Sequence, residues 1–281
     1  MNLRKVSAAA AIAAALSLTA AACGEGNKGE SAGDGGGDKV TIGIKFDQPG
    51  LGQKTSSGKY EGFDVDVATY VAKKLGYKES DIEWKETPSP DRENMIKRGD
   101  VDFIVATYSI NPERQKEVDF AGPYFLAHQK LLVRSDAKVT TAKDLNNSKS
   151  TLCSVTGSTS AQNVKKDFAP KAQLQSANGY SECLPGLENG KIDALTTDDS
   201  ILAGYAAMPE HKGKFKVTGA PLSNENYGIG LKKGDTKLKD KINKALESMV
   251  SDGEWEKAVK KNFAAANYKY EPAPKIGDIK Q

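Results

Sequence analysis

Short apolar alternations and longer helical stripes follow one another through the first half of the chain. Val40, Ile42 and Ile44 alternate with smaller or polar residues, which predicts a strand over residues 40–45. Apolar residues spaced by three and four predict a helix over residues 64–75, and Gly76 supplies its stop. The series continues with a strand at 82–85, a helix at 91–98 ended by Gly99, and a buried strand at 101–107.

A second series of the same kind starts near residue 129. Strands are expected at 130–133, 151–155, 192–196 and 227–231, and helices at 160–168, 182–188 and 199–208. Two C-terminal helices follow, with apolar stripes from Leu238 to Met249 and from Trp255 to Phe263, and residues 268–281 are expected as a loose tail. Alternating strands and helices predict the α/β class, with parallel sheets covered by helices, in two units without an obvious linker.

Composition excludes several classes of protein. The chain has 281 residues, of which 38% are hydrophobic and 27% charged, and this suits two modest globular domains rather than a disordered chain. No apolar run approaches the roughly 20 residues of a membrane-spanning helix, so a polytopic membrane protein is excluded. A formal charge of +3 without a basic cluster argues against nucleic-acid binding. With three cysteines and two histidines, we expect no metal and no cofactor.

The N-terminus has the pattern of an export signal. Arg4 and Lys5 precede an Ala- and Leu-rich stretch that runs to Ala22, so residues 1–22 are expected to be a signal peptide. The alternative is a membrane anchor helix, but the stretch is short and alanine is weakly hydrophobic. We therefore expect an exported protein.

The residues after this stretch resemble a bacterial lipobox. Ala20, Ala21 and Ala22 precede Cys23, although the lipobox usually has Leu where Ala20 stands. The resemblance implies that Cys23 carries a lipid and anchors the chain to the outer face of the cell membrane. Seven glycines among residues 24–38 predict a flexible tether, which a lipidated Cys23 would explain. The alternative is ordinary cleavage after Ala22.

Two cysteines remain in the body of the chain. An exported chain lies in an oxidising compartment, so Cys153 and Cys183 are expected to form a disulfide rather than a metal or catalytic site. Two free thiols are the alternative.

Charged and hydroxyl side chains gather where the expected strands end, which is where ligands bind in open parallel sheets. These residues are Lys45, Thr107, Ser109, Arg114, the Thr-Gly-Ser-Thr-Ser turn at 156–160, and Asp198. A turn that opens a helix and an arginine fork both suit a carboxylate, and Asp198 suits an ammonium group. The pattern therefore favours an α-amino acid as ligand. Lys45 and Arg92 add two further cations, so the site charges sum to 3 − 1 = +2.

Each residue also has a simpler explanation. Arg114 could be a solvated loop charge, and Lys45 and Arg92 could be surface cations. The turn at 156–160 could only cap its helix, and Asp198 could cap the helix that follows it. The shared position of these residues at strand ends favours the binding interpretation.

Several motifs resemble the polar amino-acid solute-binding proteins of ABC importers (family 3 type). They are GFDVD at 62–66, NPER at 111–114, VDF at 118–120, GPY at 122–124 and YGI at 227–229. The resemblance implies a two-lobed, periplasmic-binding-protein-like (type II) fold with two crossing strands, near 124–128 and 223–228. It places lobe 1 at 39–124 plus 228–270, lobe 2 at 129–222 and a C-terminal tail at 271–281.

The resemblance also implies roles for the site residues. Arg114, Ser109, Ser158 and Thr159 match the positions that hold the ligand α-carboxylate, Asp198 matches the ammonium ligand, and Thr107 matches a further contact. Lys45 and Arg92 match basic residues of the glutamate/aspartate binders, and KFDQPG at 45–50 and TDDSILAG at 197–204 look like that subgroup. A cation at Lys45 argues against glutamine and basic amino acids, whose binders have an acidic residue there.

The expectation is therefore a monomeric, lipid-anchored receptor outside the cell that captures glutamate or aspartate and delivers it to ABC permease subunits. We expect no enzymatic activity, because His128 and His211 both fall outside the strand-end set. The alternatives are a dehydratase-like enzyme on the same scaffold, a binding protein for another polar amino acid such as glutamine, and a sensor subunit.

Overall fold

The structure is a computed structural model that describes residues 39–280. The expected signal peptide at 1–22, the lipidated Cys23 and the tether at 24–38 lie outside the described residues. No helix in the described range is long and apolar enough to cross a membrane.

Strands from both series form one mixed sheet. Within residues 39–280 it has the order β5-β1-β6-β12-β7-β10-β8-β9, and β11 also pairs with β7. The bounds are β1 Val40–Ile44, β5 Ile82–Glu86, β6 Phe103–Ile104, β7 Asp119–Arg134, β8 Thr151–Val155, β9 Gln173–Ala177, β10 Ala194–Asp198, β11 Phe215–Thr218 and β12 Asn224–Leu231. A small antiparallel sheet contains β2 Asp47–Gln48, β3 Gly52–Lys54 and β4 Tyr60–Glu61.

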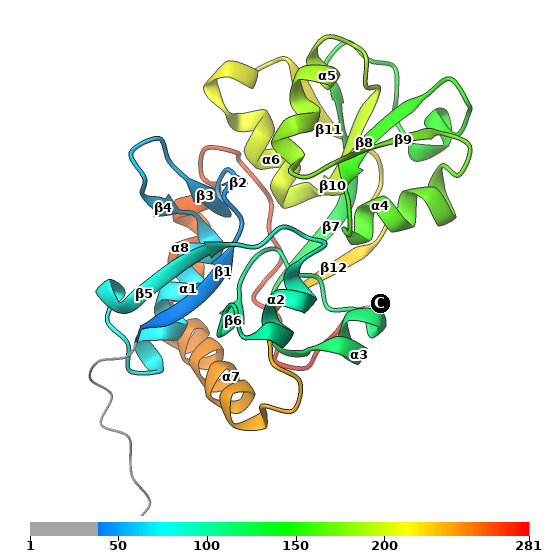
Figure 1. Cartoon of the computed structure of the whole chain (residues 1–281). Helices are drawn as coiled ribbons and strands as arrows, with labels where there is room; N and C mark the ends of the chain where they lie inside the picture. The colour runs from blue at the N-terminus through cyan, green and yellow to red at the C-terminus, as the bar shows by residue number, and fades with distance from the viewer. Residues whose placement is uncertain (1–38, 281) are drawn as a thin grey trace, which may run out of the picture. The chain divides into compact units, whose positions relative to one another are not determined.

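Two long strands connect two parallel halves. The strand β1 pairs in parallel with β5 and β6, and β8 pairs in parallel with β9 and β10. Between these halves, residues 119–128 of β7 pair with β12, and residues 129–134 pair with β10 and β11. The strand β7 therefore passes from one half to the other beside β12, as Figure 1 shows. This is the expected α/β type II fold, with two lobes and two crossing strands.

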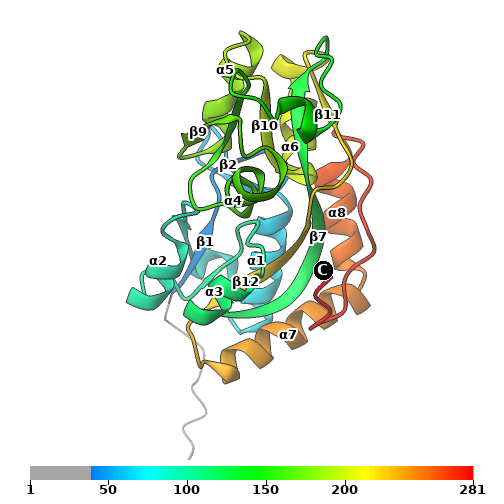
Figure 2. The same ribbon diagram turned by 90° about the vertical axis from the view of Figure 1, so that its right-hand side faces the viewer.

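Helices cover both lobes. Helices α1, α7 and α8 lie on one side of the β1–β6 half, and α2 and α3 lie on the other side (Figure 2), while α4, α5 and α6 pack in the β8–β10 half. The bounds are α1 Phe63–Lys74, α2 Arg92–Arg98, α3 Pro112–Glu117, α4 Thr159–Asn163, α5 Leu184–Glu188, α6 Asp199–Ala207, α7 Thr236–Ser251 and α8 Glu254–Phe263.

Aromatic side chains attach the C-terminal helices to the first lobe. Phe125 of β7 stacks on Phe263 of α8 with centroids 5.6 Å apart, and Phe63 of α1 packs edge-on against Trp255 at 5.9 Å. The Trp255 indole N–H donates to the Tyr124 carbonyl at 2.8 Å. Buried aromatic pairs of this kind contribute strongly to a core. The C-terminal helices, which follow β12, therefore complete the lobe in which the chain began.

Several sequence expectations differ from the structure, of which three bear on the site or on the C-terminus. The strand expected at 101–107 is paired only at Phe103–Ile104, because the chain turns into the left-handed region at Thr107, where φ is 44°. Helix α3 was not expected, although Asn111 caps it and Pro112 occupies its first turn. The tail is not loose: Lys280 and Asn226 exchange two hydrogen bonds, at 2.8 and 3.0 Å.

Candidate functional site

A small polar cavity lies where the two lobes meet. It is lined by Ser89, Arg92, Thr107, Ser109, Arg114, Ser158, Thr159, Tyr180 and Asp198. Seven of the eight predicted ligand residues line it, and Lys45 is the exception.

Arg114 is held by its helix cap and by three neighbouring acceptors. Asn111 Oδ1 accepts from the Arg114 backbone N–H at 2.8 Å and so sets the first turn of α3. In the guanidinium, Nη1 donates to the Ser109 carbonyl at 2.7 Å, Nη2 donates to the Gly157 carbonyl at 3.1 Å, and Nε lies 3.4 Å from Glu93. Each Nη carries two N–H groups, so one on each remains for a ligand. This arrangement suits a carboxylate held at two points.

The turn before α4 faces Arg114 from the other lobe. Ser158 caps the helix, because its Oγ accepts from the Ala161 N–H at 3.0 Å. The simpler explanation of this turn is therefore correct for Ser158, yet Ser158 and Thr159 also line the cavity. The Ser158 hydroxyl group and the start of α4 add hydrogen-bond donors close to Arg114, which again favours an anionic group, whereas the Thr159 hydroxyl group already donates to Glu225.

Asp198 supplies a carboxylate at the end of β10. Its Oδ2 accepts from the Tyr227 hydroxyl at 2.6 Å, and its side chain makes no capping hydrogen bond to α6. Burial, and next the charge of Glu225, raises the pKa of Asp198 well above its usual range. A cationic group in the cavity would offset both effects, so Asp198 suits an ammonium group.

Lys45 and Arg92 are buried cations. Lys45 Nζ donates to Ser89 Oγ at 2.9 Å and reaches the cavity only through that hydroxyl group. Arg92 Nη1 donates to the Ala106 carbonyl at 2.9 Å, and its guanidinium lies 4.1 Å from the centre of the Tyr108 ring. Their side chains are therefore not surface cations, with residue exposures of 6% and 2%.

The two cations repel one another and lose hydration. Burial, and next the charge of Arg92, lowers the pKa of Lys45 well below its usual range. Burial lowers the pKa of Arg92 to about 10, and the positive charge of Arg114 is the second largest cause. An anionic group nearby would relieve both effects, so this side of the cavity also favours a carboxylate.

Thr107 is fixed by a buried carboxylate. Its N–H donates to Asp64 Oδ2 at 2.8 Å, while Tyr124 donates to the other oxygen at 2.7 Å. Burial raises the pKa of Asp64 to about 6, against the effect of these two hydrogen bonds. The carboxyl group thus holds Thr107 in its positive-φ conformation at the cavity wall.

Sequence patterns did not identify several contributors. Ser89 and Tyr180 line the cavity, but Ser89 lies in a loop between two prolines and Tyr180 in a short 3₁₀ turn, Tyr180–Cys183. Glu225 is 2% exposed and accepts from the hydroxyl groups of Thr159 and Ser223 at 2.8 and 2.6 Å. Glu93 and Glu225 lie beside the charged groups of the cavity. The formal site charge of +2 expected from the sequence leaves out these two carboxylates and is therefore incomplete.

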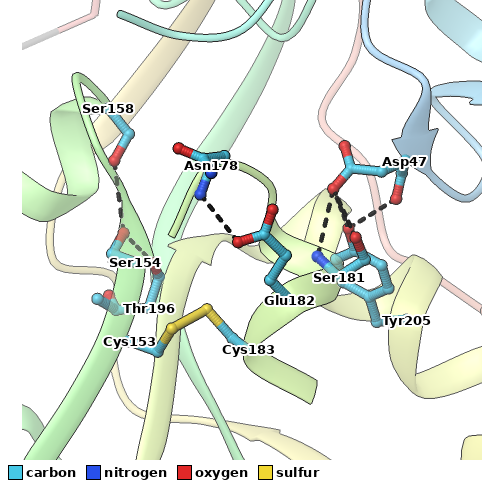
Figure 3. Close-up of a disulfide and its surroundings, with 10 residues drawn as sticks. All are labelled: Asp47, Cys153, Ser154, Ser158, Asn178, Ser181, Glu182, Cys183, Thr196 and Tyr205. Carbon is cyan, nitrogen blue, oxygen red and sulfur yellow. Dashed lines mark hydrogen bonds between the residues drawn. A yellow bond between two sulfur atoms is a disulfide. The ribbon is translucent and has the colours of Figure 1, made fainter. Parts of the chain in front are cut away.

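Cys153 and Cys183 form a disulfide with their Cα atoms 5.9 Å apart (Figure 3). It ties the Tyr180–Cys183 turn to β8. Neither histidine lines the cavity: His128 faces Asp199 at 3.7 Å, and His211 packs on Phe215. Within residues 39–280, no group of three His, Cys, Asp or Glu side chains is placed to hold a metal ion.

The two lobes, and a cavity that suits a carboxylate on one side and an ammonium group on the other, define an amino-acid-binding protein. The chain belongs to the bacterial extracellular solute-binding proteins, family 3, whose family model matches residues 40–265. The resemblance to the polar amino-acid solute-binding proteins of ABC importers is thus confirmed.

Relatives carry names of binding proteins. The chain is 47% identical over 264 residues to the glutamate-binding protein GluB of Corynebacterium efficiens, covering 90% of this chain and 88% of that protein. It is 38% identical to the ABC transporter glutamine-binding protein GlnH of Bacillus subtilis, covering 92% and 97%. Among solved structures, an ancestral arginine-binding protein bound to glutamine matches with a TM-score of 0.73 and 35% identity, covering 80% of this chain and 97% of that one.

Proposed function

We propose that the protein captures glutamate outside the cell, with aspartate as a weaker or equal ligand, and delivers it to an ABC importer. The observation that carries this proposal is the pair of buried cations, Lys45 and Arg92, on one side of a cavity that already offers partners for an α-carboxylate and an ammonium group. The names of the GluB relatives support the same ligand.

Each end of glutamate has a partner in this proposal. Arg114 and the Ser158–Thr159 turn hold the α-carboxylate, Ser109 and Thr107 add contacts beside it, and Asp198 holds the ammonium group. Arg92 holds the side-chain carboxylate directly, and Lys45 acts on it through Ser89. Several charge-assisted hydrogen bonds of about 1.5–3 kcal/mol each are enough for micromolar or tighter binding.

Binding closes the two lobes. Residues 129–222 move as one body against residues 39–124 and 228–270, with β7 and β12 as the hinge. Contacts from both lobes to one ligand favour the closed state, because a ligand stabilises the state to which it binds more tightly. Arg114 and Asp198 come from different lobes in this division, so a bound amino acid bridges them.

Glutamine is the second candidate. The interposed Ser89 offers a neutral hydroxyl group between Lys45 and the cavity, which an amide could also use, and GlnH and the glutamine-bound ancestral protein are similar to this chain. Two buried cations favour the acid over its amide, because a carboxylate offsets their repulsion and an amide does not.

A thermal-shift screen of the twenty amino acids tests the proposal. Ligands that bind the native state raise the unfolding midpoint, so glutamate should give the largest rise, with aspartate smaller or equal. The largest rise with glutamine would favour the second candidate. No rise with any amino acid would contradict both.

Lipid attachment at Cys23 holds this receptor at the outer face of the cell membrane after residues 1–22 are removed. Mass spectrometry of the mature chain should find an acylated Cys23, and detergent but not salt should release the chain from membranes. A Cys23→Ser variant should be released without detergent. A mature mass without acyl chains would contradict the anchor.

A further inference from the structure

Outside the cavity, Asp47 joins the two lobes. This residue of β2 accepts at Oδ2 from the Ser181 N–H at 3.2 Å and from the Ser181 hydroxyl at 3.1 Å. The Tyr205 hydroxyl donates to the Asp47 carbonyl at 2.6 Å and lies 3.3 Å from Oδ2 (Figure 3). None of these three residues lines the ligand cavity.

Two glycines allow the lobes to come this close. A Cβ atom at Gly179 would lie 2.6 Å from Asp47 Oδ2, and a Cβ atom at Gly204 would lie 2.2 Å from the Pro49 carbonyl oxygen. Neither glycine has a positive φ, and glycine is a poor residue inside a helix such as α6. The backbone conformation therefore does not require glycine at these positions, whereas the contact with lobe 1 does.

The lobe 2 side of this contact is rigid. The disulfide of Cys183 ties the turn to Cys153 on β8, and Glu182 accepts from the Asn178 N–H at 3.2 Å (Figure 3). The same β8 leads into the turn that presents Ser158 to the cavity. Asp47 therefore meets a fixed part of the lobe rather than a free loop.

We propose that Asp47 and Pro49 of lobe 1, with Gly179, Ser181, Gly204 and Tyr205 of lobe 2, form a latch that stabilises the closed state and so sets the affinity for amino acids without touching them. The inference rests on the proposed function. Measured affinity is the intrinsic affinity reduced by the fraction of binding-competent molecules. Loss of the latch should therefore weaken every ligand by the same factor.

Calorimetric titrations with glutamate and with glutamine test the latch. Gly204→Ala places a methyl group against the Pro49 carbonyl, and Asp47→Ala removes the acceptor. Each variant should lower glutamate affinity about tenfold or more, and Gly204→Ala, which leaves the Asp47 charge that acts on Lys45 unchanged, should keep the glutamate-to-glutamine ratio within about twofold. The thermal midpoint of ligand-free Gly204→Ala should not fall, because alanine favours the helix. Gly186→Ala is the matched control, since the atoms nearest to its Cβ belong to the Ile192 side chain of the same lobe, and it should keep wild-type affinity.

Wild-type glutamate affinity in Gly204→Ala, a changed ligand ratio in Gly204→Ala, or an equal loss in Gly186→Ala would overturn the latch. Failure of the proposed function looks different, because the wild-type chain would then bind neither amino acid. In that case hydrogen exchange at the Ser181 amide decides: faster exchange in Asp47→Ala supports the latch, and equal exchange overturns it.

Discussion

Replacing Arg114 by alanine is expected to weaken glutamate binding severely. The residue is 7% exposed, and its guanidinium already satisfies the Ser109 and Gly157 carbonyls, with one N–H left on each Nη for the ligand. Alanine removes both remaining donors and the positive charge. It also leaves the Ser109 and Gly157 carbonyls without their partner, and because Gly157 belongs to the other lobe, the loss of that contact falls on the closed state.

The expected magnitude follows from the two free donors. At roughly 1.5–3 kcal/mol for each charge-assisted hydrogen bond, the gross contribution is about 3–6 kcal/mol. Truncating one side of a buried charged pair costs about 2–5 kcal/mol in practice. This corresponds to a rise in Kd of about 30-fold to about 4,000-fold.

Titration calorimetry of glutamate against wild type, Arg114→Ala and Arg114→Lys measures this loss. Lysine keeps the charge but not the planar fork, so its Kd should fall between the other two. Circular dichroism of each ligand-free variant controls for misfolding. An unchanged Kd in a folded Arg114→Ala variant would refute the assigned role.

Four further experiments test other parts of the account. Lys45→Ala should weaken glutamate more than glutamine, and equal losses in calorimetry would contradict a side-chain role. Changing Cys153 and Cys183 together to serine opens a loop of 30 residues and should lower the free energy of unfolding by about 3–4 kcal/mol, which urea unfolding measures. The pKa of Asp64 is raised to about 6, from 3.8; the native state therefore holds its proton more tightly, and this stabilisation is present below about pH 4 and lost as the pH rises through 6. Urea unfolding at pH 4 and at pH 7 measures how far the free energy of unfolding falls between the two, and in Asp64→Asn this fall should be smaller by about 3 kcal/mol than in the wild-type chain. An identical fall in both proteins would exclude the raised pKa of Asp64. Because burial also raises the pKa of Asp198, acidification through that pKa should protonate it and weaken glutamate binding, and pH-independent affinity would be evidence against the ammonium contact.

The site residues at the strand ends were predictable from the sequence, because the topology of the sheet brings the ends of its strands together. Thr107, Ser109 and Arg114 come from one lobe and Asp198 from the other, yet all line one cavity. The carboxyl ends of neighbouring parallel strands share an edge of the sheet, so apolar periodicity was enough to find them. The disulfide followed from export and cysteine count alone.

The remaining features depend on long-range packing. Lys45 ends its strand as expected, but Ser89 from a distant loop stands between it and the cavity. Glu225 lies in a buried crossing strand, and its neighbour Thr159 is 66 residues away. No local pattern reports such pairs, because their members lie far apart in the sequence and meet only in the folded chain. The same holds for Asp47, whose partner Ser181 is 134 residues away.

A comparison of the affinities for glutamate and for glutamine tests the central claim most directly. Calorimetry of the wild-type chain with each amino acid at pH 7 compares a carboxylate and an amide of nearly the same shape opposite Lys45 and Arg92. The account predicts that glutamate binds at least tenfold more tightly. Equal affinities, or tighter binding of glutamine, would contradict it.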